Sequence, residues 1–301
     1  METKSLKILI IGGSGHISGK AAQQAIAAGH QVWTVNRGLR SHPQGAIGLI
    51  ADRHDTENFK KVISGAQTHW DFVIDSICFD IEDAKIDIEL FKDRADHFAF
   101  ISTDFVFDPK YRTFPQRQDD SHYVSENYGA KKRLCELEFF NSSMHCTIFR
   151  PCHVYGPGSR LGCLPQHVRD ADLIKKIKAG RPLQLVGGGH FLQQPIFAAD
   201  LAALILSSAD NPKAFGQIYL CAGPDILESR KYYQIIGDIL GVEVKIEEVS
   251  VTQYLSECPA GNEAFICHRI YDLKKIHDDG LKAPSTPIEK GLKAQVLDLL
   301  K

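Results

Sequence analysis

The sequence lacks a dominant charge and a long apolar run. Its 301 residues carry 35 Lys and Arg against 37 Asp and Glu, for a net charge of −2. That balance gives no general attraction to nucleic acid or to an anionic membrane. No apolar stretch approaches the roughly 20 residues that a membrane helix needs. The rest of the composition, 44% hydrophobic and 24% charged, is typical of a compact soluble protein with a small-molecule site.

Closely paired cysteines are also missing. The eight cysteines stand singly, and no two of them form a C-x-x-C pair, which excludes a zinc ribbon and a thioredoxin-like motif. No metal site is expected. Scattered cysteines of this kind usually behave as small buried hydrophobes in a reducing compartment. The apolar run 6–11 ends in a glycine-rich turn and predicts a strand rather than a signal sequence, so we expect a cytoplasmic protein.

Short strands alternate with helices in the first half of the chain. The run LKILII at 6–11 is apolar throughout, as a strand buried on both faces should be. This alternation predicts an α/β fold with a doubly wound parallel Rossmann sheet. Besides 6–11, strands are predicted at 31–35, 46–51, 71–76, 97–102 and 146–150, and helices at 20–29, 56–66, 80–94 and 125–142.

From residue 151 onward the pattern changes and predicts a smaller α/β substrate-binding lobe. We assign residues 1–150 and about 194–221 to the sheet domain, and about 151–193 with 222–301 to the lobe. The segment 154–165 is rich in Gly and Pro and predicts a long loop. The remaining elements are predicted as helix 166–179, strand 183–186, helix 199–209, a strand 217–221 that returns to the main sheet, and strand 242–249.

The first predicted strand runs into a turn that is suited to a dinucleotide. Gly12, Gly15 and Ser18 stand at the spacing G-x-x-G-x-x-G, where Ser18 replaces the last glycine imperfectly. Glycines allow a tight turn and a close approach of the backbone to a pyrophosphate, which the following helix N-terminus attracts. Glycine turns also follow strands for purely structural reasons, so the strand and helix that flank this one favour the binding interpretation.

The end of the second predicted strand lacks an acidic residue for the ribose of NAD. Asn36 and Arg37 stand there, and a guanidinium in place of a carboxylate favours the 2′-phosphate of NADP over NAD. A surface turn with a solvated arginine is the alternative. Asp52 follows the third strand and is placed to accept a hydrogen bond from an adenine amino group, unless it only forms a turn before Thr56.

Tyr128 and Lys132 lie one helical turn apart in the segment YGAKK, so both side chains share a face of the predicted helix. A phenol with a pKa near 10 is a poor base at neutral pH, but an adjacent ammonium and an oxidised nicotinamide would lower that pKa. A Tyr/Lys pair at this spacing usually lies on the protein surface and has no catalytic function. The segment FISTDFVFDP at 100–109, at the carboxyl end of a predicted strand, favours a site.

Five motifs now stand in order: GGSGHIS, Asp52, ISTDFVFD, YGAKK and RPCHVYGPG. Together they resemble the extended short-chain dehydrogenase/reductase superfamily, in its NAD-dependent epimerase/dehydratase branch. The resemblance runs from about Lys7 to Asp200 and continues weakly to the C-terminus. ISTDFVFD is similar to a stretch of dTDP-4-dehydrorhamnose reductases, whereas the glycine-rich turn is more like atypical members.

The resemblance implies a role for several side chains. Thr103 would bind the reacting oxygen of the substrate, Tyr128 would be the acid/base, Lys132 its electrostatic partner, and Asp104 an auxiliary acid or a loop cap. Cys152 and His153 would lie near the nicotinamide, although a lone histidine there is more often a structural hydrogen-bonder. The implied cofactor-binding residues are Gly12, Gly15, His16, Ile17, Asn36, Arg37, Asp52, Ser76, Cys78, Tyr128, Lys132 and Pro151.

The resemblance implies a reductase or epimerase that acts on a carbonyl or secondary alcohol of a sugar-like substrate, either with or without a nucleotide. Two departures narrow this expectation. Gln193 stands where relatives keep an arginine for a diphosphate, and Arg160, Arg169 or Arg269 could replace it. Phe105 stands where dehydratases keep a glutamate, which disfavours loss of water. A homodimer is implied, and a non-catalytic NAD(P)-sensing or RNA-associated protein is the alternative.

Overall fold

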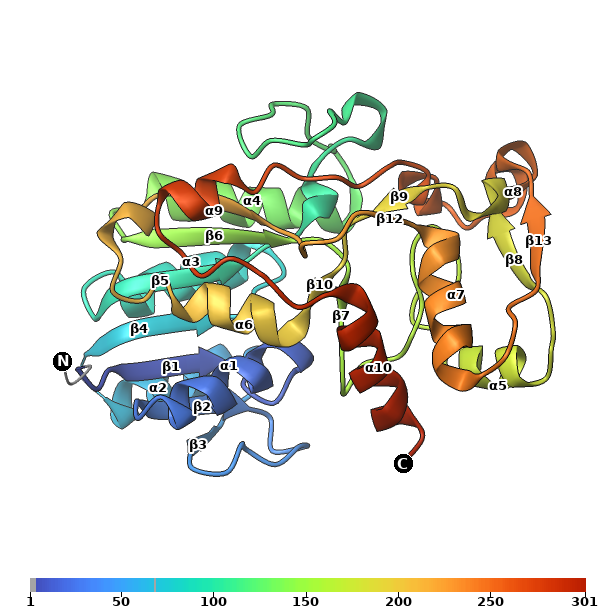
Figure 1. The fold of residues 1–301 in the computed structure, drawn as a ribbon. Coiled ribbons are helices and arrows are strands. Elements are labelled where there is room, and N and C mark those ends of the chain that lie inside the picture. The colour runs from blue at the N-terminus through green and yellow to red at the C-terminus, as the bar shows by residue number, and fades with distance from the viewer. Residues whose placement is uncertain (1–3, 68) are drawn as a thin grey trace.

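The computed structural model describes residues 4–67 and 69–301. A parallel sheet of seven strands lies at the centre, in the order β11-β6-β5-β4-β1-β2-β3 (Figure 1). The predicted doubly wound Rossmann sheet is therefore confirmed. Its strands are β1 (Lys7–Ile11), β2 (Gln31–Asn36), β3 (Ile47–Ile50), β4 (Trp70–Asp75), β5 (Ala95–Ile101), β6 (Cys146–Pro151) and β11 (Ile218–Cys221).

The strand order alone indicates where a ligand would bind. The chain leaves β1 towards β2 on one side and later returns to β4 on the other, so the connections after β1 and β4 diverge. A crevice opens at the carboxyl ends of strands at such a switch point, and ligands of open α/β sheets bind there. Residues that follow β1, β4 and β5 therefore meet at one edge of the sheet.

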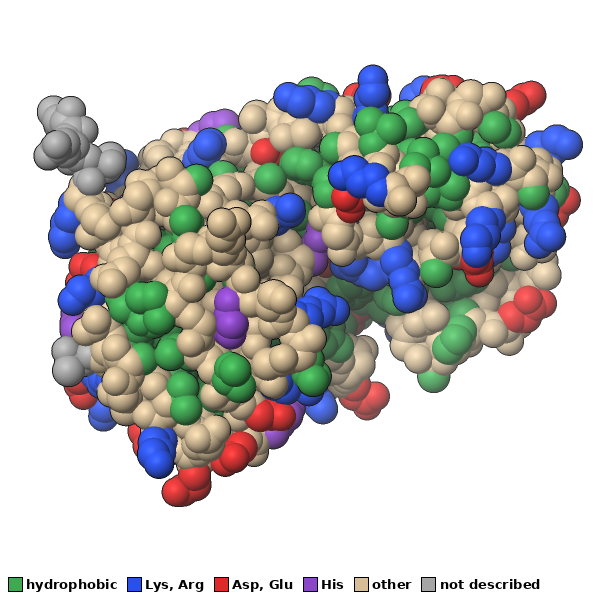
Figure 2. Space-filling view, turned by 90° about the horizontal axis from the view of Figure 1, so that it is seen from below, with side chains coloured by type: hydrophobic (Ala, Val, Ile, Leu, Met, Phe, Trp, Pro, Cys, Tyr) green, Lys and Arg blue, Asp and Glu red, His purple; other side chains and the backbone are tan. Residues whose placement is uncertain are grey.

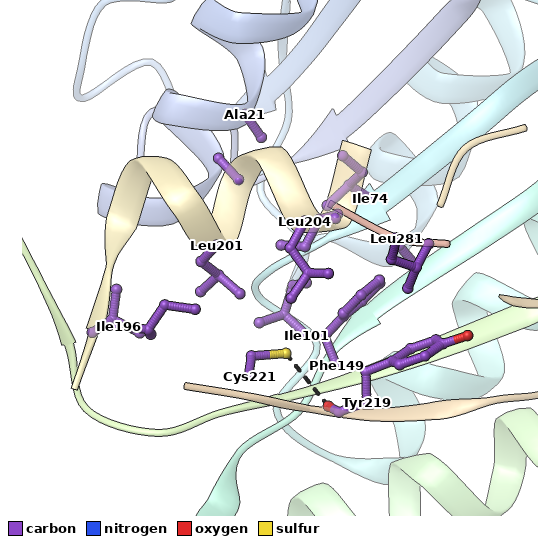
Figure 3. Close-up of a cluster of buried hydrophobic side chains, with 14 of the residues drawn as sticks. Ala21, Ile74, Ile101, Phe149, Ile196, Leu201, Leu204, Tyr219, Cys221 and Leu281 are labelled. Atoms are coloured by element: carbon purple, nitrogen blue, oxygen red, sulfur yellow. Dashed lines mark hydrogen bonds between the residues drawn. The ribbon is translucent and has the colours of Figure 1, made fainter. Parts of the chain in front are cut away.

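Helices cover both faces of the sheet with two separate apolar cores. Helices α1 (His16–Ala27) and α6 (Ala198–Leu206) pack on one face, where Leu201 and Leu204 lie over Ile101 and Phe149 (Figure 3). The other face is covered by α2 (Thr56–Ala66), α3 (Ile81–Phe91) and α4 (Asn127–Asn141). No helix in the described ranges is both long and apolar enough to cross a membrane.

The smaller lobe has a core of its own, at the right of Figure 1. Tyr232 and Tyr233 pack in it against Leu173 and Ile177. The lobe and the connections to it contain β7 (Val154–Tyr155), α5 (Leu173–Lys178), β8 (Leu183–Val186), β9 (Leu192–Gln193), β10 (Ile196–Phe197), β12 (Leu227–Glu228), α7 (Ser229–Leu240), β13 (Ile246–Val249), α8 (Val251–Glu257) and α10 (Ile288–Leu299).

Two predictions for this half need correction. The helix expected at 166–179 is confined to Leu173–Lys178, because His167 and Arg169 have positive φ and interrupt a helix. The segment from Tyr271 to Leu281, with α9 (Lys274–Asp278), does not pack in the smaller lobe. Its apolar side chains join the core beneath α6, so this part of 222–301 belongs with the sheet. Strand β11 returns to the sheet as predicted and pairs with β6.

Candidate active site

The glycine-rich turn is built for close contact between backbones. Gly12 has φ +81, and a Cβ there would lie 2.6 Å from Ile77 Cγ2 and 2.9 Å from Ser76 Oγ. The amides of Gly12 and Gly13 both donate to the Val35 carbonyl, at 2.9 and 3.2 Å. Side chains are thereby kept out of the crevice after β1, and the N-terminus of α1 faces it. The chemistry of this cradle fits the pyrophosphate of a dinucleotide.

Ser18, which stands at the position of the third glycine, makes two hydrogen bonds that a glycine could not make. Its buried hydroxyl donates to the Gly12 carbonyl at 2.5 Å and accepts from the Gly15 amide at 3.2 Å. The side chain therefore fastens the first turn of α1 to the loop that precedes it. Serine replaces close glycine packing here with two hydrogen bonds.

A cleft of about 620 Å³ extends from this turn past the ends of β2 and β3. Asn36 is committed locally, since its Oδ1 accepts from the Gly38 amide at 2.7 Å and its Nδ2 donates to the Arg40 carbonyl at 3.1 Å. Asp52 lines the cleft and also accepts from the His54 amide at 3.0 Å, which is the turn role considered as its alternative. Predicted residues that line this cleft are Gly12, Gly15, Asn36, Arg37 and Asp52.

Arg53, which the sequence did not single out, lies at the inner wall of this cleft and is 5% exposed. Its Nε donates to Asp83 at 2.7 Å and its Nη2 to Asp87 at 2.6 Å, while its Nη1 donates to Asp75. Burial opposes the guanidinium charge, but the surrounding carboxylates raise the Arg53 pKa well above its usual value. Burial raises the pKa of Asp87 in turn. Arg53 and the three carboxylates around it therefore form a buried charged cluster at the wall of this cleft.

A second cleft, of about 630 Å³, begins at the same glycines and runs towards the smaller lobe. It brings together residues from the turn after β1, the ends of β4, β5 and β6, the start of α4, and two further segments at 164–169 and 260–265. Predicted residues that line it are Gly12, Gly15, His16, Ile17, Ser76, Thr103, Asp104, Tyr128, Lys132, Pro151, Cys152 and His153.

Tyr128 is held at the mouth of this cleft by its neighbour. The Gly129 position abuts the Phe105 carbonyl so closely that a Cβ would not fit, which sets the first turn of α4 against the loop after β5. The Tyr128 ring is 46% exposed. Burial, followed by the charge of Asp104, raises the pKa of its hydroxyl to about 12. The lowering expected from Lys132 is absent in the polypeptide itself.

Lys132 is fully buried one turn further along α4. Its ammonium donates to the backbone carbonyls of Cys78 at 2.7 Å and Ile101 at 2.6 Å, which belong to the ends of β4 and β5. The rings of Phe79 and Phe100 lie 5.0 and 4.6 Å from Nζ. Burial lowers the pKa of Lys132. The side chain therefore ties α4 to the sheet edge and places a positive charge there.

The carboxylate of Asp104 is not a free acid, because three side chains donate hydrogen bonds to it. Its Oδ2 accepts from Tyr271 Oη at 2.6 Å, from Arg112 at 2.9 Å and from Arg269 at 3.3 Å. Burial favours the protonated form, but the charges of Arg112 and Arg269 outweigh it and lower the pKa of Asp104. The carboxylate therefore stays ionised, and its contacts join the loop after β5 to the segment at 269–271.

Thr103 sits between two such anchored neighbours. Its hydroxyl accepts from the Phe105 amide at 3.3 Å and faces the cleft. Ser102 beside it donates to Glu136 at 2.6 Å, and Glu136 receives two hydrogen bonds from the buried Arg150, at 2.9 and 2.7 Å. This network fixes the carboxyl end of β5, and with it the Thr103 hydroxyl.

The loop after β6 contributes a neutral imidazole. His153 lines the cleft, and burial together with the nearby charge of Arg169 lowers its pKa to about 4. Cys152 is buried, and its thiol donates to the Gln194 carbonyl at 2.9 Å. Gln193 is also buried, away from the residues that line either cleft, and its side-chain amide has no hydrogen-bond partner among the described residues.

One predicted contact needs correction. The Cys78 side chain does not lie along either cleft, because it points into the core with its thiol directed to the Asp80 carbonyl at 3.9 Å. Ile77 lines both clefts, and Phe79 lines the first cleft, which extends past β2 and β3. These two apolar residues, together with Arg53 and Arg112, form parts of the site that motif spacing did not reveal.

The parallel sheet, the glycine turn at its switch point and the adjoining clefts define an α/β protein with a Rossmann fold. Comparison with known families adds the next step. Residues 87–222 match the model of the NAD dependent epimerase/dehydratase family. That segment of the chain is similar to this family.

Two curated proteins are similar in sequence. UDP-glucose 4-epimerase of Vibrio cholerae is 29% identical over 117 residues, which cover 37% of this chain and 34% of the relative. The Arabidopsis thaliana protein named NADH dehydrogenase [ubiquinone] 1 alpha subcomplex subunit 9, mitochondrial, is 24% identical over 244 residues, 77% of this chain. That match spans 57% of the relative, so this chain corresponds to only part of either protein.

Solved structures extend the similarity to the whole chain. WbmH of Bordetella bronchiseptica, crystallised with NAD+, superposes with a TM-score of 0.78 over 99% of both chains at 16% identity. UDP-glucuronic acid 4-epimerase of Bacillus cereus, crystallised with UDP-glucuronic acid and NAD, has a TM-score of 0.77 at 17% identity and covers 98% of this chain and 99% of its own. At such identities the similarity establishes the fold.

Proposed function

We propose that this protein is an NAD(P)-dependent oxidoreductase or epimerase that acts on a carbonyl or secondary alcohol of a sugar-like substrate. One observation carries the proposal. Thr103, Tyr128 and Lys132 line a single cleft that starts at the dinucleotide cradle of Gly12 and Gly15. Side chains that can bind and protonate an oxygen therefore adjoin the place where the cofactor would be held.

Each side chain has a distinct task in this proposal. The Tyr128 hydroxyl exchanges a proton with the substrate oxygen, and the Thr103 hydroxyl holds that oxygen by a hydrogen bond. A pKa of about 12 keeps Tyr128 protonated at neutral pH, so it is ready to donate during carbonyl reduction. The nicotinamide, when bound, supplies the hydride and, in its oxidised form, a positive charge that adds to that of Lys132.

Loss of water is disfavoured by the residues next to Thr103. Dehydration requires a base for the carbon-bound proton and an acid for the departing hydroxyl. Phe105 cannot transfer a proton and packs edge-on against Phe265, with ring centroids 5.7 Å apart. Asp104 is ionised and fully engaged by Arg112, Arg269 and Tyr271. We therefore propose reduction, or epimerisation by oxidation and re-reduction, and assign Asp104 a positioning role.

The cofactor end supports NADPH as the preferred nucleotide. Arg37 and Arg40 both line the cleft beyond β2, and the side chain of Asn36 is occupied by local backbone groups. Two guanidinium groups without an acidic residue at the ribose position suit a 2′-phosphate. The related structures named above were crystallised with NAD, so the choice between the two nucleotides is a separate part of the proposal.

Two measurements test the catalytic proposal. We expect protein fluorescence to report binding of NADPH or NADH, and turnover of keto sugars to oxidise the bound nucleotide. The Tyr128→Phe variant should bind the nucleotide normally and lose activity by about 10²–10⁴-fold. A Tyr128→Phe variant with undiminished turnover would refute the assignment. A product 18 mass units lighter than the substrate would refute the exclusion of dehydration.

A non-catalytic dinucleotide-binding role is the second candidate. It is favoured by the similarity to a protein named as a subunit of NADH dehydrogenase, and by the engagement of Lys132 with two backbone carbonyls. Binding of nucleotide without any turnover of carbonyl substrates would support it. Salt-sensitive RNA binding under the same conditions would support the RNA-associated variant instead.

We further propose a cytoplasmic homodimer. Leu134, Leu137 and Phe140 of α4 are exposed and share one side of the helix that begins beside Tyr128. Apolar side chains gathered in this way suit an interface between two copies of the chain. The cysteines are unpaired, and all but Cys258 are buried, as is usual in a reducing compartment.

A further inference from the structure

Arg169 is an exposed cation at the wall of the second cleft, and it has no acidic partner among the described residues. It lines the cleft, and its Nη1 donates to Ser159 Oγ at 2.6 Å. No carboxylate lies within ion-pair distance of it in residues 4–67 and 69–301. By contrast, Arg112 and Arg269 share the carboxylate of Asp104. A guanidinium left in this state is available to an anion from outside the protein.

The backbone around Arg169 holds it in place. His167 and Arg169 both have φ +54, and Gly162 lies so close to their backbone atoms that a Cβ would not fit. The His167 ring bonds to the Gln184 carbonyl at 3.0 Å and to Asp170 at 3.2 Å. Asp170 also pairs with Lys176 at 2.6 Å, so the nearest acid in sequence is already neutralised.

An unpartnered imidazole lies in the same cleft. Both ring nitrogens of His16 are buried and have no hydrogen-bond partner in the part of the chain that is described. His153 lines this cleft from the β6 side. Burial, with a further contribution from the charge of Arg169, lowers the pKa of each imidazole to about 4. Near neutral pH both rings are therefore uncharged, and each offers one N–H donor beside the guanidinium.

Most of the charged side chains that line the cleft are cationic. Arg112, Lys132 and Arg169 line it, and Asp104 is the single carboxylate among its lining residues. In Figure 2, Lys and Arg side chains lie along the left and upper edges of the hollow between the two parts of the molecule. Such a cleft attracts anions. The buried, unpartnered amide of Gln193 supplies no further charge.

We propose that Arg169, with His16 and His153, binds a carboxylate or phosphate monoester carried by the sugar-like substrate itself. This inference rests on the proposed function of the cleft and narrows its substrate to a sugar acid or sugar phosphate without a nucleotide. Arg169 supplies the charge and a planar pair of donors, and the two imidazoles supply further hydrogen bonds to the anion.

The test is calorimetric titration of the full chain, saturated with its nicotinamide nucleotide, with D-galacturonate, D-galactose 6-phosphate and neutral D-galactose. We expect the two acidic sugars to bind at least about tenfold more tightly than galactose. Arg169→Gln should remove that difference and leave the affinity for the nucleotide unchanged. Arg160→Gln, at an exposed arginine of the same loop that does not line the cleft, is the matched control and should bind like the parent protein.

Several results would overturn the inference. Equal binding of the acidic and neutral sugars, or no binding of any of them, would do so. A loss of nucleotide affinity in Arg169→Gln would show that the arginine serves the cofactor pyrophosphate instead. Micromolar binding of UDP-glucose that is insensitive to Arg169→Gln would restore a nucleotide substrate. Failure to bind NADPH or NADH is a separate outcome, because it would refute the proposed function rather than the role of Arg169.

Discussion

Replacement of Arg53 by methionine should destabilise the protein strongly. The side chain is buried with three carboxylates, Asp75, Asp83 and Asp87, and it is the only cation that forms ion pairs with them in the described chain. Methionine keeps most of the volume but leaves the carboxylates without compensation. Removing one partner of a buried ion pair costs ~3–5 kcal/mol. A domain is stable by only ~5–15 kcal/mol, so the change should be easy to measure.

The loss should depend on pH in a defined direction. Burial already raises the pKa of Asp87 above its usual value of 3.8. Without Arg53 the cluster should bind protons still more readily in the folded state than in the unfolded state. Stability of the variant then falls as pH rises, so its deficit should be larger at about pH 8 than at about pH 5.5.

Urea unfolding at both pH values is the assay. Arg181→Met is the control, because Arg181 is exposed and its replacement should change the free energy of unfolding by less than about 0.5 kcal/mol. A deficit below about 1 kcal/mol for Arg53→Met would refute the reasoning, since that is the range of exposed ion pairs. A deficit that is equal at the two pH values would show that proton uptake by the carboxylates is not the cause.

Three further predictions follow from the site. Arg37→Ala should weaken NADPH binding and leave NADH binding nearly unchanged in fluorescence titrations; tighter binding of NADH by the parent protein would contradict the expected preference. Free UDP or dTDP should bind weakly in calorimetry because Gln193 is uncharged, and micromolar affinity would contradict this. Burial opposes ionisation of Glu136, but Arg150 lowers its pKa below the usual 4.5, so its stabilisation is present above that pH and lost as pH falls. Glu136→Gln should therefore cost ~3–5 kcal/mol near neutral pH, and less in acid, by thermal unfolding.

Local signals in the sequence predicted most of the sheet domain. Helix α2 begins and ends at the predicted residues, Thr56 and Ala66, and its start is fixed by Asp55, which caps it by accepting from the Asn58 amide. The glycine turn and the i, i+4 spacing of Tyr128 and Lys132 likewise depend on neighbours in sequence. These features bring the cofactor cradle and the proposed catalytic side chains to the same cleft.

The electrostatic setting of the site could not be predicted in the same way. Asp104 meets Arg269 across 165 positions, and Arg53 meets Asp87 across 34. Pairs so distant leave no periodic pattern in a single sequence. The same holds for Arg169, whose direction depends on positive φ angles and on close packing against Gly162 rather than on a helix.

The path of the chain between sheet and lobe has a consequence for how the molecule can come apart. The chain enters the lobe after β6, returns for α6 and β11, leaves again for α7, comes back with the segment from Tyr271 to Leu281, and ends in the lobe with α10. No single cut therefore separates a complete sheet from a complete lobe. A fragment that ends before residue 194 lacks the edge strand β11 and the α6 cover, so Phe149 and Ile101 would face water. We expect limited proteolysis to yield no stable half, and both parts to melt in one transition.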